Sequence, residues 1–205
     1  MSPIQNESAH REHDPREMLL LSGGKLFQDV GYVQASIQRI ASAINAPKGT
    51  FYNYFKSKED LFLALFEART QEYIDDVVRR LKKCAPGKQS IDAFRDFYAD
   101  LAHDKTWPIL TLEFKLFALR HAESKNRLRK AFLMMKSSGT EDFTHQLFGP
   151  LTRQQKSALD RSLVALGPIV SGLILESYFD PQILSEASIR QILTTVFNAL
   201  FASVK

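Results

Sequence analysis

Residues 36–58, SIQRIASAINAPKGTFYNYFKSK, decide the fold of this chain. Ser36 is a good N-cap for a short helix reaching about Ile44, because its hydroxyl can accept a backbone N–H from the first turn. Asn45 tolerates the left-handed conformation that a tight turn requires. Pro47 suits the first position of a following helix, where its missing N–H is harmless. The stretch therefore predicts two short helices joined by a turn of about three residues, the helix-turn-helix arrangement.

The second of these helices has one apolar and one polar side. At about 100° per residue, the apolar arc carries Pro47, Phe51, Tyr54 and Phe55. The opposite side carries Gly49, Tyr52 and Asn53, with Lys48 and Thr50 at its edges. Gly49 removes a side chain where such a helix would approach DNA. Lys48, Tyr52 and Lys58 are candidates for phosphate contacts, while Thr50 and Asn53 are candidates for base edges. Ser36 and Gln38 open the first helix, whose N-terminus favours a phosphate.

Charge along this stretch favours a nucleic-acid partner. The whole chain has a net charge of +4, but residues 36–58 contain no Asp or Glu. Their basic residues are Arg39, Lys48, Lys56 and Lys58. A local basic stripe is typical of DNA-binding surfaces, although a solvated basic face would look the same.

Composition narrows the class of protein. With 205 residues, 44% of them hydrophobic and 24% charged, the chain can bury a sizeable core. The lone Cys84 excludes an internal disulfide and fits a reducing compartment. No run of 18 apolar residues and no apolar leader is present, so we expect a cytoplasmic protein without a membrane span. Without a glycine-rich phosphate loop, a catalytic triad spacing or a Cys/His cluster, we expect no enzyme activity, cofactor or metal site.

Helical periodicity continues along the rest of the chain, and strand signals are nearly absent. A first helix ends at Gly31 and contains the unusual pair Gly23-Gly24. Each glycine costs about 1 kcal/mol relative to alanine in a helix interior, and close backbone packing is one explanation for the pair. A long helix starts at Lys58 and breaks at residues 85–87. Further helices are expected at about 89–103, 108–121, 124–148, 152–179 and 184–203. Pro168 predicts a kink or break within its helix. The sequence therefore predicts an all-α protein.

Residues 31–67 strongly resemble the TetR family of bacterial transcription regulators. The family pattern appears here as Gly31-Tyr32, Ser36-Ile37, Ile40-Ala41, Lys48-Gly49-Thr50-Phe51-Tyr52, Tyr54-Phe55 and Lys56-Ser57-Lys58-Glu59-Asp60-Leu61. The chain departs from it at Ala35, Asn45, Ala46 and Pro47. Pro47 stands where the family usually has serine, so this chain lacks a hydroxyl that could contact phosphate there.

The resemblance implies separate domains for DNA binding and for ligand binding. A tail (1–14) precedes a three-helix DNA-binding domain (15–57), and residues 58–205 form a larger helical domain that binds a ligand and dimerises. A homodimer would place two reading helices about one DNA turn apart on a palindromic operator of double-stranded DNA. The long helix from Lys58 joins both domains and is the expected lever by which an unidentified small-molecule effector releases a repressor.

Aromatic and soft apolar residues between the fourth and eighth helices exceed what a minimal core needs, which predicts a cavity for a hydrophobic or amphipathic effector. The candidate ligand-binding residues are Phe66, Phe97, Trp107, Glu113, Phe117, Met135 and Phe143. Ordinary core packing is the alternative for each aromatic. Two other functions remain open: a DNA-binding protein of the same fold without a small-molecule ligand, and a helical metabolite-binding protein or enzyme.

Overall fold

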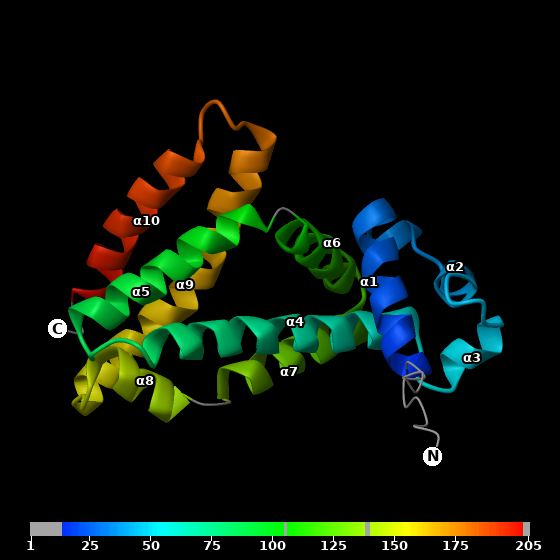
Figure 1. Ribbon diagram of the computed structural model, residues 1–205, viewed down its shortest axis with the longest axis horizontal. Coiled ribbons are helices and arrows are strands. Elements are labelled where there is room, and N and C mark those ends of the chain that lie inside the picture. The colour runs from blue at the N-terminus through cyan, green and yellow to red at the C-terminus, as the bar shows by residue number, and fades with distance from the viewer. Residues whose placement is uncertain (1–13, 105, 138–139, 203–205) are drawn as a thin grey trace, which may run out of the picture. The chain divides into compact units, whose positions relative to one another are not determined.

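A computed structural model describes residues 14–104, 106–137 and 140–202 (Figure 1). The tail expected at residues 1–14 therefore lies, except for Asp14, outside the described residues. The described residues form α1 (Pro15–Gln34), α2 (Ile37–Ser42), α3 (Lys48–Tyr52), α4 (Lys58–Leu81), α5 (Lys88–Asp100), the 3₁₀ helix η1 (Leu101–His103), α6 (Trp107–Arg120), α7 (Ala122–Ser137), α8 (Thr140–Phe148), α9 (Arg153–Phe179) and α10 (Glu186–Phe201). The all-α prediction is confirmed.

The chain divides into two compact units, residues 1–65 and 66–205. The helix α4 begins in the first unit and continues into the second. They are named unit 1 and unit 2 in that order.

Unit 1 is built around an interruption in α1. Gly31 has φ 78° and ψ 165°, a left-handed conformation that glycine adopts without strain. The predicted end of the first helix at Gly31 is thus seen as a break, after which helical turns resume as far as Gln34. The break turns the Tyr32 ring into the core, where its centroid lies 5.6 Å from that of Phe27 and 5.3 Å from that of Phe62. These three aromatic side chains are almost fully buried.

The glycine pair of α1 faces leucine side chains of α4. A methyl group at Gly23 would overlap a δ-methyl of Leu61, whereas one at Gly24 would stand 3.4 Å from Leu65 Cδ2. Leu61 is fully buried and cannot yield readily. The close packing that could explain this pair is therefore present, and it is tighter at Gly23.

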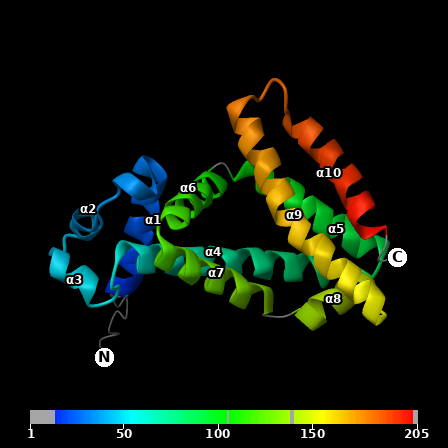
Figure 2. The same ribbon diagram turned by 180° about the vertical axis from the view of Figure 1, so that it is seen from behind.

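The core of unit 2 joins the end of α4 to α5, α8, α9 and α10. Its buried side chains are Val77, Leu81, Phe94, Phe97, Ala99, Leu147, Ala158, Leu159, Leu166, Val170, Ile174, Ile189, Leu193, Phe197 and Phe201. Both views show α9 and α10 side by side (Figure 2). The Ser162 hydroxyl of α9 donates to the Leu200 carbonyl of α10 at 2.6 Å, which fixes the register of the pair.

Two helices differ from their predictions. The segment predicted as one helix at 124–148 forms α7 and α8, and the intervening Ser138 and Gly139 lie outside the described residues. The helix α9 runs through Pro168 without interruption. Pro168 and Val164, whose carbonyl loses its helical donor, are both exposed, so water can replace the missing hydrogen bond.

By length and composition alone, α9 is apolar enough to cross a membrane. One such helix is weak evidence, because the core helix of a globular protein passes the same test. Leu159, Leu166 and Ile174 of α9 are buried in unit 2. We therefore treat α9 as a core helix.

Candidate nucleic-acid interface

The first element of the candidate interface is α2, which is capped at its N-terminus and anchored to α1 through its buried side. The Ser36 hydroxyl accepts the backbone N–H of Arg39 at 3.3 Å, which is the predicted N-cap. Ile40 and Ala41 are fully buried, and the Ser22 hydroxyl of α1 donates to the Ile40 carbonyl at 3.0 Å. The outer face of α2 consequently points to solvent.

The turn between α2 and α3 has the predicted geometry. Asn45 adopts φ 54°, the left-handed conformation, and the Ala46 N–H donates to the Ala41 carbonyl at 3.0 Å. Pro47 is the N-cap of α3 with φ −65° and ψ 153°, one position earlier than predicted. The Thr50 N–H donates to the Pro47 carbonyl at 2.9 Å and closes the first turn.

One side of α3 is anchored and the other is exposed. Phe51 is fully buried and Phe55 is 4% exposed, with ring centroids 5.6 Å apart. Because α3 ends at Tyr52, Tyr54 lies beyond the helix and its side chain is 40% exposed. The prediction that Tyr54 packs on the apolar side of the helix is therefore wrong. The anchored Phe51 sets the direction of the side chains on the free side.

The exposed side of α3 brings together most of the predicted DNA-contacting residues. Lys48, Gly49, Tyr52 and Asn53 are exposed, and Thr50 is half-buried between the two sides. Lys48 Nζ lies 5.9 Å from the centroid of the Tyr52 ring, so the cation and the aromatic face form one surface. A methyl group added at Gly49 would meet no atom within 4 Å, so the glycine leaves the surface open.

Two predicted residues lie on α2 or just before it. Ser36 and Gln38 are both exposed, and Gln38 Nε2 donates to the Ser42 hydroxyl at 3.3 Å along the outer face. Arg39 is exposed on the same helix but was not included among the predicted contacts. The acid-free stripe of residues 36–58, which includes Arg39, was the signal that could have added it.

Lys58 occupies a different environment from the other predicted contacts. Its ammonium donates to the carbonyls of Tyr32, Val33 and Ala35 at 2.7, 3.1 and 2.9 Å. Burial lowers the pKa of Lys58 below its ordinary value. The structure therefore engages Lys58 within unit 1 instead of extending it to solvent beside Lys48.

The predicted ligand-binding residues whose side chains the structure describes take part in several separate contacts of unit 2. In unit 2, Phe66 stacks on Trp107 with centroids 6.0 Å apart, and Phe117 stacks on His121 at 4.0 Å. Glu113 is half-buried. Phe97 lies in the core and touches the open hollow described next. The side chains of Met135 and Phe143 lie outside the described residues.

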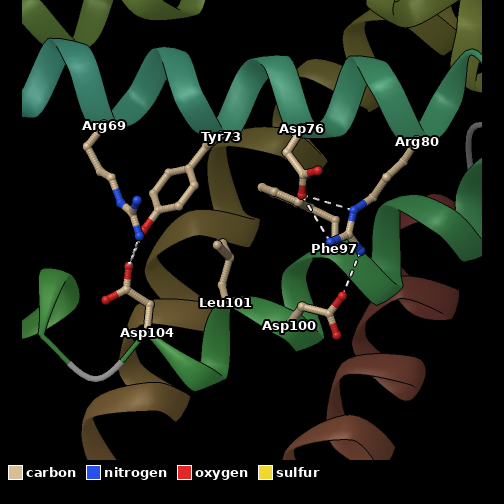
Figure 3. A pocket seen from close by; sticks show the side chains of 8 residues that line it. All are labelled: Arg69, Tyr73, Asp76, Arg80, Phe97, Asp100, Leu101 and Asp104. Atoms are coloured by element: carbon tan, nitrogen blue, oxygen red, sulfur yellow. Dashed lines mark hydrogen bonds and ion pairs between the residues drawn. The ribbon is translucent and has the colours of Figure 1, made fainter.

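An open hollow of about 200 Å³ lies between α4 and the segment formed by α5 and η1 (Figure 3). Its lining is Arg69, Tyr73, Asp76, Arg80, Phe97, Asp100, Leu101 and Asp104. The lining is mostly charged and includes only Phe97 of the predicted ligand-binding residues, so this hollow is a different feature from the apolar cavity predicted from the sequence. Sequence reasoning missed it because acids and bases three or four positions apart on α4 look like an ordinary solvated helix face.

Two sets of ion-paired side chains connect the opposite walls of this hollow. Asp104 accepts from Arg69 and from the Tyr73 hydroxyl, each at 2.7 Å. Burial would raise the pKa of Asp104, but these hydrogen bonds outweigh it and hold the pKa below its ordinary value. Arg80 donates to Asp76 at 3.0 Å and to Asp100 at 2.7 Å. The described arrangement thus ties α4 to the α5 end of unit 2 by charge-assisted hydrogen bonds.

Residues 19–65 match the family described as bacterial regulatory proteins, tetR family. The fatty acid metabolism regulator protein of Bacillus subtilis is 26% identical over 126 residues, which cover 60% of this chain and 65% of that protein. The HTH-type transcriptional repressor NemR of Escherichia coli is 38% identical over 64 residues, covering 31% of this chain and 32% of that repressor. The chain thus matches less than two thirds of the length of either relative.

A solved structure extends the likeness to nearly the whole chain. The transcriptional regulator FadR from Bacillus subtilis, crystallised in complex with stearoyl-CoA, aligns with a TM-score of 0.62 at 19% sequence identity. The alignment covers 92% of this chain and 99% of that one. This likeness shows the fold: an N-terminal helix-turn-helix followed by a helical C-terminal part.

Proposed function

Since the chain belongs to the TetR family of bacterial regulatory proteins, whose members are transcription regulators and not enzymes, we propose that it is a ligand-responsive repressor. In this proposal a homodimer in the cytoplasm binds a palindromic operator through residues 15–57, while residues 58–205 dimerise and bind the effector. The observation that carries the proposal is the exposed, acid-free side of α3, held in place by buried Phe51.

The chemistry of that side suits duplex DNA. Lys48 supplies charge for a phosphate, and the Tyr52 ring beside it supplies a hydroxyl that can donate to phosphate oxygen. Asn53 and Thr50 offer the donors and acceptors that base edges in the major groove require. Ser36 and Gln38, both exposed at the start of α2, are the proposed contacts to the flanking backbone, and the open surface at Gly49 supports a close approach of α3 to DNA.

The outer faces of α9 and α10 support a homodimer. Residues 162–175 of α9 and 191–201 of α10 contain no charged residue. Val164 is 55% exposed and Ile192 is 36% exposed on these helices. Methyl groups added at Gly167 or Gly172 would meet no atom within 4 Å, so a second helix can approach there. Exposed apolar surface of this kind marks an interaction site.

A hydrophobic or amphipathic effector is supported by residues of unit 2 and by the relatives. Apolar rings such as those of Phe66 and Trp107, which stack on each other in unit 2, suit an acyl chain. One relative is a fatty acid metabolism regulator, and one solved structure of the same fold contains stearoyl-CoA. An effector acts only if it binds the DNA-competent and DNA-incompetent conformations with different affinities.

Stearoyl-CoA is expected to release the wild-type protein from DNA of its own promoter region. We expect release that follows the stearoyl-CoA concentration, because binding to the incompetent conformation withdraws protein from the operator. Fluorescence anisotropy of labelled DNA measures it, with coenzyme A lacking the acyl chain as the matched control. DNA binding that no acyl-CoA or other amphipathic ligand weakens would favour the DNA-binding protein without an effector. An absence of DNA binding would contradict the proposal itself.

A further inference from the structure

We infer that Lys58 is a positioning residue that clamps the α1–α2 connection to the first turn of α4, and that it is not a phosphate contact. The inference rests on the proposed function to the extent that the position of α2 matters for operator affinity. The clamp itself is a property of unit 1 in the absence of DNA.

The clamp forms because α1 is interrupted at Gly31. Beyond a break in a helix, carbonyl groups lack the N–H partners that helical turns would supply. Three such carbonyls, those of Tyr32, Val33 and Ala35, converge on one atom, Lys58 Nζ. A lysine ammonium has three N–H donors and no acceptor, so three carbonyls use its full capacity. Their distances of 2.7, 3.1 and 2.9 Å are those of charge-assisted hydrogen bonds.

Apolar contacts hold the same turn of α4 in place. Lys58 Nζ also lies 4.6 Å from the centroid of the Tyr32 ring, and that ring is only 2% exposed. Phe62, one helical turn after Lys58, packs edge-on against Tyr32 at 5.3 Å. The first two turns of α4 therefore contact Tyr32 in two ways: Lys58 binds the Tyr32 carbonyl, and both Lys58 and Phe62 contact the Tyr32 ring. Such a partly desolvated cation over an aromatic face is stabilising.

The clamp fixes the start of α2 directly. Ala35, whose carbonyl is the third acceptor, precedes Ser36, and Ser36 caps α2 through the Arg39 N–H. The position of Ser36 and Gln38 at the operator therefore depends on where Lys58 holds Ala35. Any displacement of the first turn of α4 is passed to α2 through the same three hydrogen bonds.

Replacing Lys58 by arginine distinguishes the clamp from a phosphate contact. The planar guanidinium of arginine cannot direct three N–H groups from one nitrogen to three converging carbonyls. It binds phosphate oxygen at least as well as an ammonium does, often with two hydrogen bonds. Lys58→Arg should consequently preserve a phosphate contact and disrupt the clamp. Lys58→Met removes both, and Lys56→Met is the control, because Lys56 is an exposed lysine only two residues away.

The test compares the full-length wild type with Lys58→Arg, Lys58→Met and Lys56→Met. In the free protein, we expect both Lys58 variants to lower Tm by about 5 °C and to speed amide exchange at residues 36–41, while Lys56→Met leaves both unchanged. With promoter DNA, we expect both Lys58 variants to lose about tenfold in affinity while the slope of log Kd against log salt stays constant.

The opposite pattern would overturn the clamp. A phosphate contact predicts that Lys58→Arg keeps wild-type affinity, and that Lys58→Met reduces the salt slope by about one per subunit with no change in Tm. If the wild type binds no DNA, the proposed function fails but the clamp is still decided: unchanged Tm and amide exchange in both Lys58 variants reject it, and the expected losses support it.

Discussion

Replacing Val164 by arginine is expected to convert the proposed dimer into monomers. Val164 is 55% exposed in the isolated chain, so an arginine there leaves the fold of one subunit intact. In a dimer built on α9 and α10 the same position becomes buried, and an unpaired guanidinium in an apolar interface is strongly unfavourable. We expect the dimer dissociation constant to rise by about 100-fold or more, the range of interface hot spots.

Sedimentation velocity over a range of protein concentrations measures this change. The matched control is Gln154→Arg, which places the same side chain at an exposed position in the first turn of α9, outside the uncharged stretch. Operator affinity should fall together with dimerisation, since a monomer reads only one half-site. A Val164→Arg variant that remains a dimer of wild-type stability would exclude this face of α9 as the interface.

Alanine at Gly23 is expected to destabilise the protein, whereas alanine at the neighbouring Gly24 is expected to be tolerated. A methyl group at Gly23 overlaps buried Leu61, and overpacking of this kind costs about 1–3 kcal/mol. At Gly24 the added methyl is 3.4 Å from Leu65 Cδ2 and gains helix propensity of about 1 kcal/mol. Both substitutions change the same residue type in the same helix, so they are matched.

Thermal unfolding followed by circular dichroism distinguishes the two glycines. We expect the Tm of Gly23→Ala to fall by about 5–10 °C, and that of Gly24→Ala to stay constant or rise. The double variant Gly23→Ala/Leu61→Val, which removes the overlapping methyl, should recover part of the loss. Equal stabilisation by both alanines would show that α1 and α4 do not approach as closely as the structure places them.

The helix-turn-helix could be predicted because its signals are local. Ser36 caps α2, Asn45 takes the left-handed turn conformation, and Phe51 anchors α3, each as its own residue type and immediate neighbours require. The helix expected at 152–179 likewise begins beside Thr152, whose hydroxyl accepts the Gln155 N–H at the start of α9. Capping and turn geometry depend on a few adjacent residues, so sequence alone was sufficient there.

The features that escaped prediction depend on residues distant in sequence. The carbonyl partners of Lys58 lie 23–26 positions earlier, and they are available only because α1 breaks at Gly31. The charged hollow joins Arg69 and Arg80 of α4 to Asp104 and Asp100. A charge pattern on one helix cannot show which opposite charge a second helix brings to it.

The break that Pro168 predicts within α9 is absent for a related reason. The cost of an internal proline depends on whether the carbonyl it leaves unpaired can reach water. Exposure of Val164 and Pro168 allows that, and exposure is a property of the assembled unit. The sequence shows the helix-breaking propensity of proline, but it does not show whether the unpaired carbonyl is exposed to water.

The central claim is that the exposed side of α3 binds DNA, and the salt dependence of binding tests it most directly. Kd for a promoter-derived palindrome is measured for the wild type, Lys48→Ala and Tyr52→Ala between 50 and 200 mM salt. The control is Lys82→Ala, since Lys82 is an exposed lysine directly after α4. We predict that wild-type affinity falls about 1,000-fold over this range. At each salt concentration, Tyr52→Ala should bind about tenfold more weakly, and Lys48→Ala should also reduce the slope by about one per subunit. Wild-type affinity that is insensitive to salt, or equal losses in Lys82→Ala and the α3 variants, would contradict the assignment.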